Sequence, residues 1–164
     1  MQATLFALPE PIQKQRSYAI PVYTVKLVRD GSMSYATAQI RSSKDIVPIM
    51  RDYLADTDRE HFVVIMLDQK IKVIGINTVS TGSLTASIVH PREVWKPVIL
   101  SNAAAVILCH NHPSGSAGPS QEDRALTTRL VAGGKLLGIN VLDHLIIGDG
   151  TGEYFSFADE GLLS

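Results

Sequence analysis

Two continuous apolar runs constrain the fold of this sequence more than any other feature. Residues 62–67 read Phe-Val-Val-Ile-Met-Leu, and residues 104–108 read Ala-Ala-Val-Ile-Leu. A strand that is apolar at every position has to be covered on both of its faces. Each run therefore predicts a strand inside a sheet that carries helices on both sides.

Helix-like and strand-like patterns alternate around these two runs. Further strands are predicted over residues 20–28, 70–79, 139–147 and 154–157, and helices over residues 43–54 (with Ser43 as the cap), 91–103 and 120–137. This alternation predicts an α/β or α+β protein with a mixed sheet. Residues 1–17 contain prolines, glutamines and charges and are expected to form a loose arm. We expect residues 18–164 to form a single domain, with its core at about 40–164.

Composition argues against several classes of protein. The net charge of −1 lacks the basic excess of a dedicated nucleic-acid binder, and Arg124 and Arg129 are too few to form a phosphate-binding cluster. The single cysteine, Cys109, excludes an internal disulfide. The first twenty residues show neither the apolar core of a signal peptide nor a membrane span. We therefore expect a cytoplasmic protein with no membrane partner.

The second apolar run leads directly into a cluster of potential metal ligands. His110 and His112 are separated by one residue, so on extended backbone both rings point to the same side. Asp123 follows after the turn-rich segment 113–119, which can fold the chain back. Two imidazoles and one carboxylate suit a catalytic zinc, whose fourth position is left for water. The pattern predicts a zinc metallohydrolase.

Each part of this pattern also has a purely structural interpretation. Ser120 and Asp123 have the spacing of a helix capping box, and the two histidines can lie in a polar loop at the end of a strand. The combination favours a metal site, because few structural needs require all of these residues together. Cys109 should point away from His110 into the core, so we interpret it as a packing residue.

Hydrolysis by a metal-activated water also needs a proton acceptor, usually a glutamate. Spacing alone leaves three candidates. Glu60 lies just before the first apolar run, where it can face the metal from the end of the sheet, whereas Glu93 and Glu122 lie in predicted helices.

The order of these residues resembles the signature of the JAMM (MPN+) metalloproteases: Glu60, His110-x-His112-Pro113, Ser120 and Asp123. Flanking phrases resemble the RadC-like JAB domain within that superfamily. They are Val89-His90-Pro91-Arg92-Glu93-Val94, His110-Asn111-His112-Pro113-Ser114-Gly115 and Leu142-Asp143-His144-Leu145-Ile146-Ile147-Gly148. The resemblance covers about residues 40–164.

This resemblance implies a JAB/MPN-like mixed sheet flanked by helices, with cytidine-deaminase-like layering. It implies zinc bound by His110, His112 and Asp123, with Glu60 as general base. It also implies that Ser120 donates a hydrogen bond to the oxyanion of a tetrahedral intermediate. The implied reaction is hydrolysis of a peptide or isopeptide bond in a peptide or protein substrate.

Full-length RadC proteins carry an N-terminal helix-hairpin-helix region, and we expect the residues before 40 to be too few to hold it. The DNA-repair association of the family name is therefore not transferred. Two alternatives remain: a nucleic-acid-associated repair or mobile-element accessory protein, and a binding module in which zinc only stabilises a loop. For Asp143 and His144 we favour a structural role over one in orienting a ligand imidazole. The sequence leaves the oligomeric state open.

Overall fold

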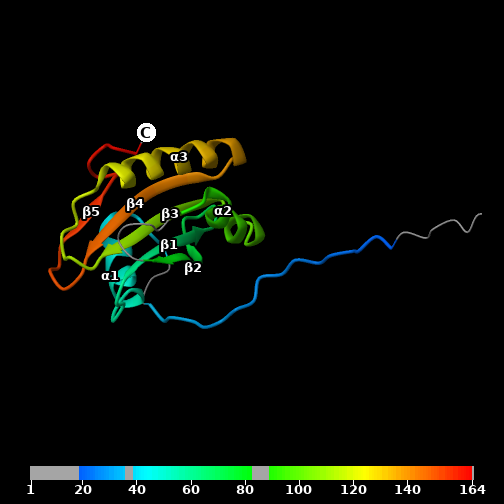
Figure 1. Ribbon diagram of the computed structural model, residues 1–164, viewed down its shortest axis with the longest axis horizontal. Coiled ribbons are helices and arrows are strands. Elements are labelled where there is room, and N and C mark those ends of the chain that lie inside the picture. Colours follow the sequence, from blue (N-terminus) through cyan, green and yellow to red (C-terminus); the bar gives the residue numbers. More distant parts are fainter. Residues whose placement is uncertain (1–18, 36–38, 83–88, 164) are drawn as a thin grey trace, which may run out of the picture.

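The computed structural model describes residues 19–35, 39–82 and 89–163. Within these ranges the chain forms one five-stranded mixed sheet, in the order β2-β1-β3-β4-β5, and three helices (Figure 1). The elements in chain order are α1 (Ser43–Tyr53), β1 (Glu60–Leu67), β2 (Val73–Gly82), α2 (Pro91–Leu100), β3 (Ala105–His112), α3 (Gln121–Leu137), β4 (Asn140–Gly148) and β5 (Tyr154–Ser156). This is the α+β class with a mixed sheet that the sequence predicts.

The strands of the two apolar runs lie side by side in the middle of the sheet. β1 pairs antiparallel with both β2 and β3. β3 pairs parallel with β4, and the helix α3 connects these two strands. β5 then pairs antiparallel with β4. The carboxyl ends of β3 and β4 therefore meet at one end of the sheet, which is where open α/β sheets usually bind ligands.

Helices cover both faces of the central strands, as the continuous apolar runs require. On one face α1 packs against alternate residues such as Val63, Ile107 and Cys109. On the other face α2 and α3 pack against Val64 and Leu108. The alternation of side chains along each strand separates these two cores.

Helices α1 and α3 begin with the same local structure. Each has a serine as N-cap and an aspartate at the third helical position, and the carboxylate of this aspartate accepts the serine N–H. Only in α3 does the serine hydroxyl also accept the N–H of the aspartate. The cap of α1 is Ser42, so the prediction of Ser43 is wrong. Ser43 lies inside the helix, and its hydroxyl donates a hydrogen bond to Asp159 Oδ2 at 2.6 Å.

The largest error of the sequence prediction is the strand expected over residues 20–28. The structure shows no strand there: the segment is extended, its large apolar side chains are exposed, and it runs away from the sheet (Figure 1, blue). Alternation of apolar residues does not by itself supply a partner edge. The loose arm predicted for residues 1–17 lies outside the described residues.

Several predicted boundaries also shift. β2 begins at Val73 instead of residue 70, because the Asp68 carboxylate accepts the backbone N–H groups of Lys70 and Lys72 and holds a turn there. α2 ends at Leu100 instead of residue 103, since Asn102 adopts a left-handed conformation with φ of 54°. None of the helices in the described ranges is long and apolar enough to cross a membrane.

Candidate metal centre

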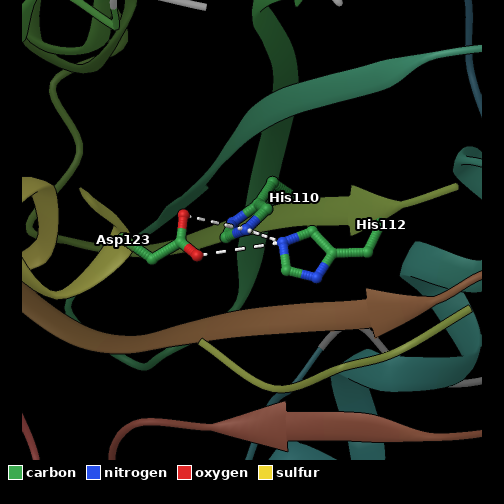
Figure 2. A group of neighbouring side chains, drawn as sticks. All are labelled: His110, His112 and Asp123. Carbon is green, nitrogen blue, oxygen red and sulfur yellow. Dashed lines mark hydrogen bonds and ion pairs between the residues drawn. The ribbon is translucent and has the colours of Figure 1, made fainter. Parts of the chain in front are cut away.

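The crossover unit β3-α3-β4 brings the predicted ligands together (Figure 2). His110 and His112 lie at the end of β3 and point to the same face of the sheet. Asp123 lies in the first turn of α3 and approaches the two rings from the other side. The turn-rich segment between them reverses the chain, as the sequence predicts. Among the described residues, this is the one group of histidine, cysteine and acidic side chains arranged so that it can hold a metal ion.

The ligand atoms of the three side chains converge on one point. His110 Nε2 lies 3.1 Å from His112 Nε2 and 3.3 Å from Asp123 Oδ1. The distance from His112 Nε2 to Asp123 Oδ2 is 3.8 Å. Ligands about 2.0–2.1 Å from a tetrahedral zinc ion are separated by about 3.3 Å. The two shorter separations match the edge of such a tetrahedron, whereas the separation of 3.8 Å is longer and involves the other carboxylate oxygen.

The ring of His112 is fixed by the loop that follows β3. Its Nδ1 lies 2.7 Å from the carbonyl oxygen of Ser116. A carbonyl can only accept, so Nδ1 carries a proton, and Nε2 is the ring nitrogen that faces His110 and Asp123. The loop itself is held by a close backbone approach, because a Cβ on Gly148 would lie 2.1 Å from the carbonyl oxygen of Gly115. Only glycine fits at position 148.

Asp123 is both a capping residue and a candidate ligand. Its Oδ2 accepts hydrogen bonds from the Ser120 hydroxyl at 2.6 Å and the Ser120 N–H at 2.8 Å. Burial alone would raise the pKa of Asp123, but the hydrogen bond and charge of His110, together with the Ser120 hydrogen bonds, lower it well below its usual range. The carboxylate is therefore ionised at neutral pH and stabilises positive charge at this point.

Ser120 is the N-cap of α3. Its hydroxyl accepts the Asp123 N–H at 3.1 Å while donating to the Asp123 carboxylate. The structural interpretation of the Ser-x-x-Asp spacing is therefore confirmed. The role of Ser120 as an oxyanion donor remains a prediction.

Glu60 is the first residue of β1 and lies at the same end of the sheet as the ligands. Alternation places it on the face of Phe62, whose ring stacks on that of His110 with 6.0 Å between the centroids. The amide of Asn111 fixes the backbone on both sides of Glu60: it donates to the Arg59 carbonyl oxygen at 3.2 Å and accepts the His61 N–H at 2.8 Å.

The two competing glutamates lie on helices. Glu93 is in α2 and forms ion pairs with Arg92 and Lys96. The hydrogen bond from Lys96 outweighs the small effect of burial and lowers the pKa of Glu93. Glu122 is exposed on α3 beside Asp123. Glu60 is the one of the three at the ligand end of β1, and its role as general base remains a prediction.

Three further predictions concern residues near the ligands. Cys109 is fully buried on the opposite face of β3, in the core under α1, as predicted. Asp143 accepts hydrogen bonds from the Ser156 hydroxyl and the Ala158 N–H and so holds the turn after β5. His144 instead contacts a candidate ligand, with its Nε2 2.9 Å from His110 Nδ1. Asp143 therefore has a structural role, whereas His144 lies beside the candidate site.

Sequence reasoning missed Asn111 and Thr127. Asn111 stands between the two histidines, so alternation along β3 points its side chain to the opposite face. The antiparallel pairing of β3 with β1 then places it near the start of β1. Thr127 lies one helical turn after Asp123, so it shares the face of the helix that carries the ligand. The Thr127 Oγ1 lies 2.6 Å from His144 Nδ1.

Fold and site together define a JAB-type domain with a potential metal centre. The profile of the RadC-like JAB domain matches residues 40–162, and the chain therefore belongs to this family. It is 50% identical over 124 residues to a UPF0758 protein of Rubrobacter xylanophilus, a match that covers 76% of this chain and 53% of that protein. It is 49% identical over 125 residues to a UPF0758 protein of Methanosarcina mazei, covering 76% and 54%. The chain spans about half the length of these relatives.

Proposed function

We propose that this protein is a zinc-dependent metallohydrolase that cleaves a peptide or isopeptide bond. The observation that supports this most strongly is that two imidazole nitrogens and the Asp123 carboxylate lie close enough together to hold one metal ion, with ligand atoms within 4.8 Å of one another. Three protein ligands of this kind are typical of catalytic zinc, whereas a closed structural site takes four. Cys109, which would be the natural fourth ligand, points into the opposite core.

Bound zinc would supply Lewis-acid chemistry here: it lowers the pKa of a water and polarises the substrate carbonyl. His110, His112 and Asp123 would hold it. Glu60 would accept the proton of the attacking water and pass it to the leaving amine. Ser120 would donate a hydrogen bond to the developing oxyanion when substrate displaces its contact with Asp123.

A nucleic-acid accessory role is the second candidate, and the charges around the site argue against it. Phosphate recognition needs several arginines or lysines. The nearest arginines on α3 are Arg124 and Arg129, and Arg129 donates a hydrogen bond to the Val89 carbonyl oxygen. At the ligand-bearing end of the sheet, Arg59 is ion-paired with Asp58 and Arg51 donates to the Gly152 carbonyl oxygen, so these described arginines are already engaged.

Hydrolysis assays test the proposal directly. Zinc-loaded protein should cleave members of a panel of peptides and lysine-linked isopeptides, and chelation should abolish cleavage until zinc is restored. A panel of single-stranded and duplex DNA oligonucleotides serves as comparison. Cleavage of DNA without cleavage of any peptide bond would contradict the proposal and favour the nucleic-acid candidate.

A further inference from the structure

A buried chain of hydrogen bonds connects two of the proposed ligands behind the site. His110 Nδ1 lies 2.9 Å from His144 Nε2, and His144 Nδ1 lies 2.6 Å from the Thr127 hydroxyl. That hydroxyl donates in turn to the backbone carbonyl oxygen of Asp123 at 2.6 Å. His110 and His144 are fully buried and Thr127 is 2% exposed. Water therefore does not compete for these contacts.

The last acceptor in this series of hydrogen bonds determines which atom donates in each of them. The Asp123 carbonyl oxygen can only accept, so the single hydroxyl proton of Thr127 is committed to it. His144 Nδ1 must then be the donor to Thr127 Oγ1. The ring of His144 is fully buried between Phe62 and Phe157, an environment that disfavours a charged imidazole. With its one proton on Nδ1, its Nε2 is unprotonated. That nitrogen accepts the proton of His110 Nδ1.

We propose that His144 and Thr127 are positioning residues that hold the Nδ1 proton of His110 toward His144, so that Nε2 is the ring nitrogen that faces Asp123 and His112 and can bind the metal. This inference rests on the metal site proposed above. The effect is preorganisation. Without these hydrogen bonds the Nδ1 proton of His110 can move to Nε2, and a metal binds only an unprotonated Nε2.

Aromatic packing holds the two hydrogen-bonded imidazole rings in place. The ring of His144 stacks on Phe157 with 5.0 Å between centroids and meets the edge of Phe62 at 5.5 Å. Phe62 also stacks on His110. Neither imidazole can rotate without disturbing these contacts, so the hydrogen bonds specify the tautomer and the aromatic rings specify the orientation.

The first test is the tautomer itself, measured on metal-free wild-type protein. Long-range ¹⁵N–¹H correlation spectra at a pH where the rings are neutral distinguish Nδ1–H from Nε2–H imidazoles. We expect Nδ1–H for His110 and His144. A predominant Nε2–H tautomer of His110 would contradict the proposal, whatever the affinity for metal.

The second test is zinc affinity, measured by competition with a chromophoric chelator. Thr127→Val removes the hydroxyl and nearly preserves the shape, and it should weaken zinc binding by about 10–100-fold, the usual effect of losing a partner of a ligand. Thr127→Ser should restore wild-type affinity. His144→Phe keeps a ring against Phe157 and removes both nitrogens, so it should bind zinc at least as weakly as Thr127→Val.

Thr128→Val is the matched control. The Thr128 hydroxyl donates to the Arg124 carbonyl oxygen at 3.0 Å, the same type of contact on the exposed side of the same helix. This variant should keep wild-type affinity. If wild-type protein binds no zinc, the metal site fails, and the tautomer still tests the hydrogen-bond chain. If wild type and a folded Thr127→Val bind zinc equally, the positioning role fails and the metal site stands.

Discussion

Each ligand of the proposed centre is oriented by a different kind of neighbour. His112 is held by a backbone carbonyl oxygen, His110 by another histidine, and Asp123 by the serine that caps its helix. The sequence allowed the ligands to be predicted because their spacing is short and their chemistry is specific. Their supporting contacts join residues far apart in the chain, such as His110 and His144, and no local pattern reveals them.

At the scale of single residues, a mutation can distinguish the role of a general base from that of a metal ligand. Glu60→Gln should retain zinc and lower turnover by about 10²–10⁴-fold, because the amide cannot accept the proton. Zinc content and hydrolysis rate are measured on the same preparation. Glu122→Gln, a change of an exposed acid beside Asp123, should leave both unchanged. Full activity of Glu60→Gln would move the base to another residue.

At the scale of elements, the two capping boxes give a direct comparison. Ser120→Ala removes a hydroxyl that accepts the Asp123 N–H, so it should lower the free energy of unfolding by about 1 kcal/mol. Ser42→Ala should cost less, because among the described residues the Ser42 hydroxyl contacts only the Asp45 carboxylate, at 3.4 Å. Only Ser120→Ala should also weaken zinc binding, because only Asp123 is a proposed ligand. Urea unfolding and zinc titration measure the two effects. Equal zinc affinity in both variants would show that the cap of α3 does not position its acid.

Most elements were predictable because their signals are local. Apolar runs defined β1 and β3, and Ser120 with Gly138 bounded α3. The strand expected over residues 20–28 was wrong because pairing requires an edge that the sequence of the strand does not specify. The cap of α1 was misplaced by one residue, since Ser42 and Ser43 are equally good caps and only Asp45 selects between them.

At the scale of the whole molecule, Cys109 reports on the integrity of the sheet. Its side chain is completely buried in β3, and burial, with a smaller effect of the Asp143 charge, raises the pKa of the thiol far above its usual range. Thiol reagents should therefore leave the native protein unlabelled at pH 8 and label it fully in denaturant. Mass spectrometry measures the extent of labelling over time. Rapid labelling of the native protein would contradict the buried position of β3.

Bound zinc should make this labelling slower in mild denaturant. A ligand that binds only the folded state stabilises it by about 2.7 kcal/mol at a concentration one hundred times its Kd. The Asp123→Ala variant should show no such protection. This prediction connects the metal site with the stability of the entire domain.

The central claim is that His110, His112 and Asp123 bind a metal ion, and elemental analysis of purified protein tests it most directly. Wild type should contain near-stoichiometric zinc, and His110→Ala, His112→Ala and Asp123→Ala should contain almost none. Asp45→Ala removes the equivalent capping acid of α1 and should keep its zinc. No metal in wild type after reconstitution, or full zinc in Asp123→Ala, would contradict the claim.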